Sequence, residues 1–359
     1  MERIIGRGMI PQFSTPDECY LTQSNMILKY NYKTAKLDKV CSVVSGLGGW
    51  QNFIKEKIFR NRIYRSYLSK NFGVNHVSVM NSSFLIAMWD KLYVHDFKDG
   101  YGEAKPVAGY QKFNIEGPLV SGVAAHEKSE CFYFGEYVNQ ETRAIRIFRI
   151  YERGTKIEVA YEFPSGEIKH VHGIFYDKYR NRLWVTTGDR DNESSIFYTD
   201  DEFQSLSELG GGDQSWRAVS VVPTEDNLYW GMDAGQDAPA SAINKIYKYN
   251  FETEIRTEVG IIGNPAYHAA KSEIDEIYLG VNFEPARKQD TPEQCAIWKF
   301  KEGGGDGWQQ IRQFDYHPGN IKNCSKYGYI YFPTGVLPKN RMVYAALNVK
   351  EREFATYLL

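Results

Sequence analysis

An internal repeat is the feature that most constrains the fold of this chain. Each copy contains a short apolar stretch, a polar turn, an aromatic-rich stretch, and then a glycine with a carboxylate close by. The clearest copies are KHVHGIFYDKYRNRLWVTTGD (169–189), WRAVSVVPTEDNLYWGMDA (216–234), YHAAKSEIDEIYLGVNFE (267–284) and VSGVAAHEKSECFYFGEY (120–137), with weaker ones at 75–97 and 320–335. The copies recur about every 45 to 50 residues, the period typical of four-stranded propeller blades.

A further hairpin follows most copies, as at 143–163 and 244–262, so each unit contains four strands. Residues 3–44 supply one more, irregular unit. An aromatic content of 15% also favours strands. We therefore expect one all-β domain over residues 1–359, a seven-bladed β-propeller with six blades as the alternative. Pairing of the N-terminal segment with strands in 342–359 would close the ring, and 46–71 would be an irregular insertion.

Charge and composition exclude several classes of protein. The net charge is −2 with Lys and Arg dispersed along the chain, which argues against nucleic acid as a partner. The chain contains no run of 18 apolar residues and no signal pattern at its start, so neither a membrane nor export is predicted. Its five cysteines are widely spaced and form no CxxC pair, which fits a reducing compartment. We expect a cytoplasmic protein, or a periplasmic or secreted one if a leader has been removed.

Propeller geometry predicts where the polar side chains of the repeat meet. The start of a blade's first strand and the end of its antiparallel second strand lie at the same face, beside the ring's axis. His170 and His172 would share a face of one strand, because side chains alternate along it. Strand starts supply His76, His170, His172, Arg217, His268 and His317, and strand ends supply Glu136, Asp189 and Asp233. Each of these residues also has a structural interpretation, as a buried histidine or as a carboxylate tying turns and blades.

Several motifs resemble a known group of proteins. They are FGEY (134–137), KHVHGIFYD (169–177), LWVTTGDRDNESSIFYTDDEF (183–203) and DQSWRAV (213–219). In this order they resemble bacterial sialidase-like, BNR-repeat propeller proteins associated with polysaccharide gene clusters. The segment FYTDDEFQSLSEL resembles the Asp-box, a structural turn of that superfamily. Sialidase motifs for catalysis are not matched, since FRIY (148–151) replaces FRIP. The plan is also similar to propeller polysaccharide lyases, which use axial histidines, tyrosines and arginines.

The resemblance and the axial residues together predict a carbohydrate-active enzyme that cleaves an acidic, uronate-containing polysaccharide or oligosaccharide by β-elimination. His170 or His172 would take the proton, since a neutral imidazole titrates near working pH. Arg217 would clamp the substrate carboxylate, and Tyr137 or His268 would protonate the leaving oxygen. Further substrate contacts are expected from Asp233, Gln214, His76 and Trp216.

Two alternatives use the same axial pocket. In a glycoside hydrolase of sialidase-like fold, two of Glu136, Asp189 and Asp233 would act as paired carboxylates. In a non-catalytic glycan-binding propeller, aromatic side chains would serve as platforms. The convergence of ionisable groups favours an enzyme. No cofactor is required by the sequence, but a divalent metal at the axis could be held by His170, His172, His268 and Gln214.

Overall fold

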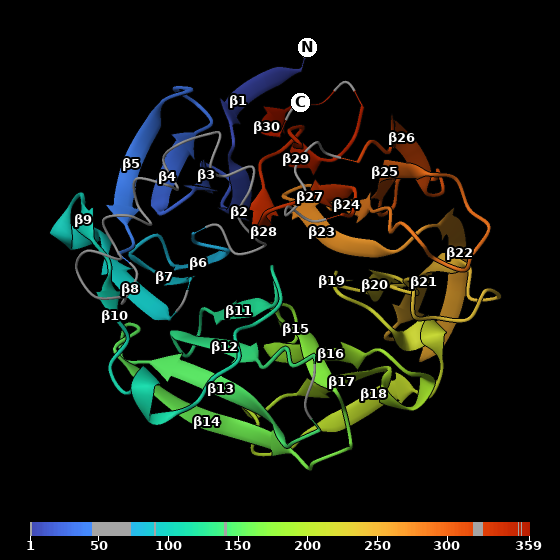
Figure 1. The fold of residues 1–359 in the computed structure, drawn as a ribbon, viewed down its shortest axis with the longest axis horizontal. Helices are drawn as coiled ribbons and strands as arrows, with labels where there is room; N and C mark the ends of the chain where they lie inside the picture. The colour runs from blue at the N-terminus through green and yellow to red at the C-terminus, as the bar shows by residue number, and fades with distance from the viewer. Residues whose placement is uncertain are drawn as a thin grey trace.

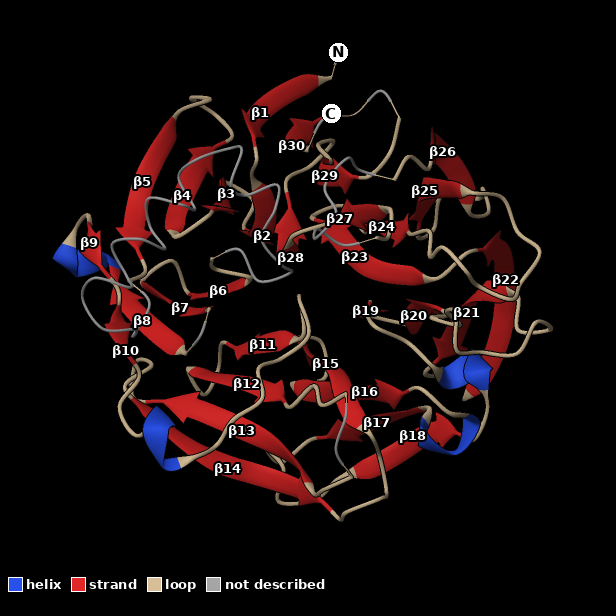
Figure 2. Ribbon diagram, in the orientation of Figure 1, coloured by secondary structure: helices blue, strands red, loops and turns tan. Residues whose placement is uncertain are grey.

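A computed structural model describes residues 2–44, 73–89, 91–139, 142–318, 326–350, 352 and 354–359. Strands arranged as blades around a common centre make up most of these ranges (Figure 1). The helices within them are short 3-10 turns, η1 (Phe97–Asp99), η2 (Tyr110–Lys112), η3 (Asp191–Glu193) and η4 (Gln214–Trp216), on the outside of the ring (Figure 2). The prediction of an all-β propeller is confirmed. The insertion predicted at 46–71 lies outside the described residues.

In the described part of the chain, five separate four-stranded sheets form blades of the ring. The first contains β6 (His76–Met80), β7 (Phe84–Met88), β8 (Leu92–Asp96) and β10 (Lys105–Pro106). The second contains β11 (Val123–His126), β12 (Cys131–Gly135), β13 (Ile145–Tyr151) and β14 (Lys156–Phe163). The third contains β15 (His170–Asp177), β16 (Arg182–Gly188), β17 (Ser195–Thr199) and β18 (Ser207–Gly211). The fourth contains β19 (Val221–Pro223), β20 (Asn227–Gly231), β21 (Asn244–Asn250) and β22 (Ile255–Gly263). The fifth contains β27 (Tyr329–Tyr331), β29 (Val343–Leu347), β30 (Ala355–Leu358) and β1 (Arg3–Arg7).

The predicted blade count, seven or six, is wrong, because the described residues form a five-bladed propeller closed by a ten-stranded sheet. One side of that sheet contains β2 (Ile10–Ser14), β3 (Glu18–Gln23), β4 (Met26–Asn31), β5 (Leu37–Ser42) and β9 (Gly102–Glu103). The other contains β23 (Ala266–Ser272), β24 (Glu276–Val281), β25 (Gln294–Lys301) and β26 (Gln309–Asp315). Between them, β28 (Thr334–Leu337) pairs in parallel with both β2 and β23. The repeat predicts where hairpins occur along the chain. It does not predict that backbone hydrogen bonds to an extra strand join two sets of strands into one sheet.

The ends of the chain meet in one blade. β1 pairs antiparallel with β30, and the outermost strand of that sheet is therefore the N-terminal one (Figure 1). This is the predicted closure of the ring by the N-terminal segment against the C-terminal strands. Closure leaves fewer unpaired sheet edges exposed.

The glycine of the repeat has a packing role. It ends the second strands β12, β16 and β20, and at the ends of β12 and β20 the first strand of the following sheet approaches closely. A Cβ atom on Gly135 would lie 2.4 Å from Val171, and one on Gly231 would lie 2.5 Å from Ala266. Only glycine allows this approach, and the carboxylate beside it is consequently held at a junction between blades.

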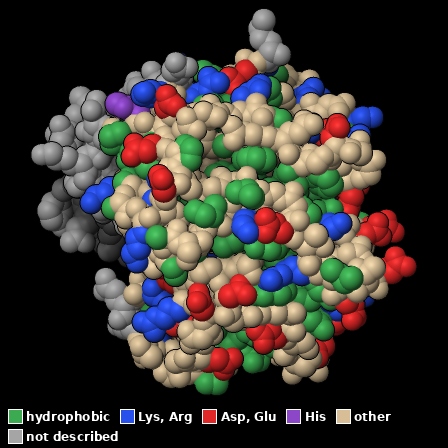
Figure 3. Space-filling view, turned by 90° about the vertical axis from the view of Figure 1, so that its right-hand side faces the viewer, with side chains coloured by type: hydrophobic (Ala, Val, Ile, Leu, Met, Phe, Trp, Pro, Cys, Tyr) green, Lys and Arg blue, Asp and Glu red, His purple; other side chains and the backbone are tan. Residues whose placement is uncertain are grey.

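The described surface has no dominant sign of charge on the side that Figure 3 draws, where basic and acidic side chains are interspersed. Within the described ranges, no helix has the length and hydropathy needed to cross a membrane. Cys19, Cys41, Cys131 and Cys295 are free thiols.

Candidate functional site

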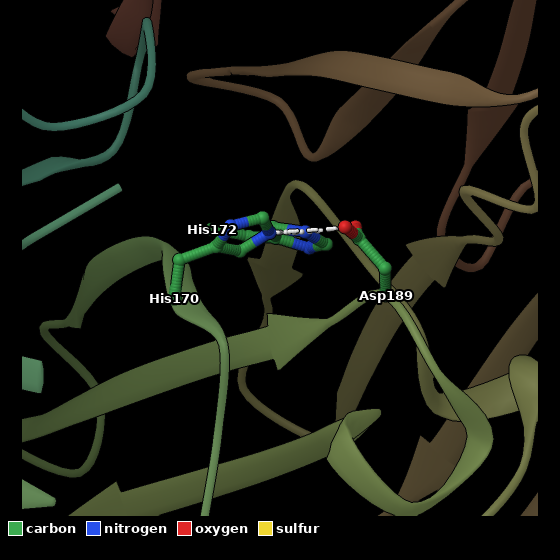
Figure 4. Close-up of side chains that lie close together, drawn as sticks. All are labelled: His170, His172 and Asp189. Atoms are coloured by element: carbon green, nitrogen blue, oxygen red, sulfur yellow. Dashed lines mark hydrogen bonds and ion pairs between the residues drawn. The ribbon is translucent and has the colours of Figure 1, made fainter. Parts of the chain in front are cut away.

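The two histidines of the KHVH segment and the aspartate at its far end lie together. His170 pairs with Gly188 across β15 and β16, which brings Asp189 beside it. The register shifts between Val171 and Gly173, so His172 is the extra residue of a β-bulge, a device that re-aims side chains near active sites. Both imidazoles point toward Asp189 (Figure 4), with Nε2 to Oδ1 distances of 3.3 Å for His170 and 3.5 Å for His172.

Backbone carbonyls determine which nitrogen of each ring carries hydrogen. His170 Nδ1 lies 2.8 Å from the carbonyl oxygen of Val138, and His172 Nδ1 lies 3.0 Å from that of Ala218. A carbonyl only accepts, so each Nδ1 donates, and a ring that carries no second proton presents a lone pair at Nε2. The two Nε2 atoms are 3.1 Å apart. Burial lowers the pKa of His172 to about 4, even though Asp189 opposes that shift, so this ring is neutral at physiological pH.

His170, His172 and Asp189 therefore form a group that could hold a metal ion. Two imidazole lone pairs and a carboxylate oxygen repel one another unless a proton on one ring or a metal cation lies between them. Donor atoms in adjacent positions around a cation with bonds of about 2.0 to 2.2 Å are about 2.8 to 3.6 Å apart. The three separations in this cluster, 3.1, 3.3 and 3.5 Å, all lie in that interval. The donor set of two imidazoles and one carboxylate suits a first-row divalent cation.

Arg217 is surrounded by carboxylates. Its guanidinium lies 3.0 Å from Asp189, 3.3 Å from Asp233 and 3.0 Å from Asp237, and the residue is 5% exposed. Burial opposes ionisation of Asp189, but the neighbouring histidines and the charge of Arg217 outweigh it and lower the carboxyl pKa. Burial raises the pKa of Asp233 well above its ordinary value despite the attraction of Arg217, so this acid binds a proton more readily.

A polar pocket of about 390 Å³ opens beside this cluster. Lys169 lines it, and its ammonium lies 2.6 Å from Asp189 Oδ2. The remaining lining residues are Asp189, Arg190, Asp191, Gln214, Asp237, Ala238 and Pro239. Hydroxyl-rich ligands are compatible with such walls, because these side chains offer both donors and acceptors.

Tyr137 adjoins the histidines, whereas Glu136 does not share their environment. The ring of Tyr137 stacks on His170 with centroids 4.0 Å apart. Burial, with the charge of Asp189, raises the pKa of its phenol. Glu136 is fully buried, and its carboxylate accepts hydrogen bonds from both Arg143 and Arg146.

The other predicted site residues have varied surroundings. His268 is buried with Nδ1 3.2 Å from Ser121 Oγ, and burial lowers its pKa to about 3. Gln214 donates to the backbone of Asp189 and to Asp191. His76 is 1% exposed, and neither of its ring nitrogens has a hydrogen-bond partner among the residues that the structure describes.

Trp216 packs rather than lines the pocket. It stacks on Trp230 with centroids 5.4 Å apart, and Arg256 lies over its ring. The metal-ligand set suggested by the sequence, with His268 and Gln214, is replaced by one in which Asp189 joins the two histidines.

Sequence reasoning missed several residues around the same cluster. Asp237 contacts Arg217, and Glu284 accepts a hydrogen bond from the backbone of Gln236 while burial raises its pKa. Glu284 ends a copy of the repeat, as Asp189 does. The repeat alone could therefore have identified Glu284 as a candidate site residue. Asp237 lies in a loop with no repeated counterpart, and no sequence signal points to it.

Comparison with known proteins gives no family for the chain. No protein-family model and no curated protein matches it. Solved structures share its fold at low identity. An oligogalacturonate lyase in complex with manganese has a TM-score of 0.58 at 9% identity, covering 98% of this chain and 89% of that chain. A GH74 enzyme from Niastella koreensis has a TM-score of 0.56 at 12% identity, covering 86% of this chain and 46% of that chain.

A chain in the mitotic checkpoint complex is about as similar, with a TM-score of 0.56 at 11% identity and coverage of 99% of this chain and 93% of that chain. Likeness at these identities shows the propeller fold alone, because propellers serve unrelated functions. The similarity in plan to propeller lyases is confirmed at the level of fold. The comparisons give no support for the sialidase-like, BNR-repeat resemblance.

Proposed function

We propose that the protein is a metal-dependent enzyme that cleaves a uronate-containing saccharide by β-elimination. One observation carries the proposal: two imidazole lone pairs and the Asp189 carboxylate converge at spacings of 3.1 to 3.5 Å beside a polar pocket. His170, His172 and Asp189 would hold the cation. When bound, a divalent cation supplies charge that neutralises a uronate carboxylate and makes the proton on the adjacent carbon more acidic.

The surroundings of Arg217 favour a positioning role for this residue. Three carboxylates already occupy its guanidinium, which leaves little capacity for a substrate carboxylate. Arg217 orients Asp189 toward the histidines and keeps its charge in place. Lys169 is better situated to meet the substrate, because its side chain is one-third exposed and lines the pocket.

Proton transfer would fall to two residues outside the metal-binding group. His268 is a neutral imidazole at physiological pH, since burial lowers its pKa. The negative charge of a bound uronate would raise its proton affinity, and it would then take the proton from the sugar carbon. Tyr137 retains its phenolic proton and would donate it to the leaving oxygen. Its stacking on His170 holds the ring beside the cluster.

A glycoside hydrolase is the second candidate, and one observation favours it. Asp189 and Asp233 flank Arg217, and their surroundings shift the two carboxyl pKa values in opposite directions. Such a divergence is typical of an acid and base pair. Asp233 would then be the acid and Asp189 the base or nucleophile.

Product analysis distinguishes the two reactions. The protein is incubated with a panel of uronate-containing polysaccharides and Mn²⁺, while the ultraviolet absorbance of unsaturated uronate and the number of reducing ends are followed. Growth of both signals, abolished by EDTA and restored by Mn²⁺, is the expected result. Growth of reducing ends alone indicates hydrolysis, and no signal across the panel contradicts an enzyme of either kind.

A further inference from the structure

We propose that the partly exposed tyrosines of the innermost strand β27, with Tyr327 just before it, form a wall on which a sugar ring of the substrate stacks. This inference deepens the proposed function and rests on it in one respect, namely that the ligand is a saccharide. The surface that binds the sugar would lie on β27, across the centre of the propeller from β15 (Figure 1).

The tyrosines form a continuous ladder along that strand. Tyr327, Tyr329 and Tyr331 alternate with Gly328 and Ile330, so their side chains share one face. Ring centroids of Tyr327 and Tyr329 are 6.0 Å apart, and those of Tyr329 and Tyr331 are 5.2 Å apart.

The ladder continues onto the next innermost strand. Tyr267 lies 5.8 Å from Tyr329, and His268 lies 4.9 Å from Tyr331, as centroid distances. Since β23 carries both Tyr267 and His268, the wall ends at the residue proposed to take the proton.

The exposure of these rings distinguishes them from packing tyrosines of the same sheet. Tyr344 and Tyr357, on β29 and β30, also stack with centroids 5.3 Å apart, but they are 0% and 4% exposed. All three tyrosines of the ladder are partly exposed. Burying apolar aromatic surface is favourable, so the exposed parts of these rings on an innermost strand are suited to contact with a ligand.

The wall and the acidic residues of the site face the same space. The hydroxyl of Tyr327 lies 2.7 Å from Gln236 Nε2. Burial and the charges of Glu284, Asp237 and Asp233 raise its pKa to about 12, which places those carboxyls near it. The negative charge of an ionised Tyr329 likewise raises the pKa of the Tyr137 phenol. A ligand between β27 and the histidine cluster would therefore contact both.

This arrangement suits the two kinds of surface that a pyranose presents. The face of a tyrosine ring carries partial negative charge, and it attracts the weakly positive C–H groups of a sugar. Hydroxyls at the edge of the sugar ring would donate to Asp237 and Glu284, since carboxylate oxygens are strong acceptors. The predicted ligand class is a short saccharide bound by stacking on one face and by hydrogen bonds at its edge.

The test measures binding without turnover. Trigalacturonate, a glucuronate-containing trisaccharide and cellotriose are titrated calorimetrically into EDTA-treated protein. We expect at least one to bind, and Tyr329→Ala to weaken its binding about tenfold, which corresponds to about 1.4 kcal/mol. Tyr329→Phe should bind like the wild type. Tyr327→Ala is a second variant at the end of the ladder, and Tyr101→Ala, at a residue 58% exposed, is the control.

The outcomes separate this inference from the proposed function. Binding that depends on the ladder, in a protein that cleaves no substrate even with Mn²⁺, supports the wall and contradicts the enzyme. Cleavage with unchanged binding in folded Tyr329→Ala and Tyr327→Ala contradicts the wall alone. If no trisaccharide binds the wild-type protein, the wall is also wrong.

Discussion

Glu136 and Asp189 occupy the same position in consecutive blades, yet their surroundings differ. Each follows the glycine that ends the second strand of its sheet. Arg143 and Arg146 both bond to the Glu136 carboxylate, and the backbone N–H of Glu116 donates to it as well. These donors come from its own sheet and the loop before it, and the carboxylate is fully buried.

Asp189 meets partners from several elements. His170 and His172 come from its own blade, Arg217 from the segment before β19, and Lys169 from the pocket wall. The side chain remains 11% exposed. The two arginines bonded to Glu136 favour a structural role for this residue. The histidines that converge on the partly exposed Asp189 carboxylate favour the proposed reactive role for Asp189. Partners, rather than position in the repeat, therefore decide the role.

The largest expected effect is at the histidines. His172→Ala removes one of the three proposed metal ligands, so turnover should fall by at least about 10²-fold. The rise in melting temperature on adding Mn²⁺ should also disappear. His317→Ala, at an exposed histidine, is the control. A folded His172→Ala variant that keeps both properties would show that the cluster is part of the scaffold, like Glu136.

The next effect is on stability at Glu136. Glu136→Ala leaves two arginines without the carboxylate that pairs with their charges. It should lower the free energy of unfolding by about 3 to 5 kcal/mol. Urea denaturation measures this loss. Glu158→Ala, which removes a half-exposed partner of Arg149, should cost about 1 kcal/mol or less. Loss of activity per folded molecule in Glu136→Ala would contradict a purely structural role.

A pair of arginine substitutions sharpens the contrast. Arg217→Lys cannot maintain contacts to three carboxylates, so Mn²⁺ affinity should fall about 10- to 100-fold through misorientation of Asp189. Arg146→Lys should lower stability and leave Mn²⁺ affinity unchanged. Calorimetric titration of Mn²⁺ into both variants checks this, and equal affinities would mean that Arg217 does not position Asp189.

The smallest effect is a pH dependence of stability. Burial opposes ionisation of Glu136, but hydrogen bonds from Arg146 and Arg143 outweigh it and hold its pKa below the ordinary value. A lowered pKa stabilises the fold above the unfolded carboxyl pKa of about 4.3, and the contribution is lost as pH falls through the folded value. The stability difference between wild type and Glu136→Gln should thus be constant near neutral pH and shrink below about pH 4. Urea midpoints across that range measure it, and a pH-independent difference would be inconsistent with the ion pairs.

The sequence alone determined the class of fold and part of the site. The repeated apolar stretch, turn and aromatic stretch predicted the blades, since strand periodicity and turns are local properties. Antiparallel pairing of the two halves of one copy predicted that His170 and His172 would approach Asp189. The glycine before each carboxylate also had a local signal, although its purpose, close approach of the next sheet, became clear only from Gly135 and Val171.

Only the tertiary structure decided the number of blades, the ion pairs of Arg217 and which residues lie together at the candidate site. β28 joins two hairpin sets because its backbone pairs in parallel with both β2 and β23, and such pairing depends on where the closed ring places it. Arg217 is occupied because Asp189, Asp233 and Asp237 converge on it from separate segments. A local pattern encodes strands and turns, but contacts among side chains from different blades exist only after the ring has closed.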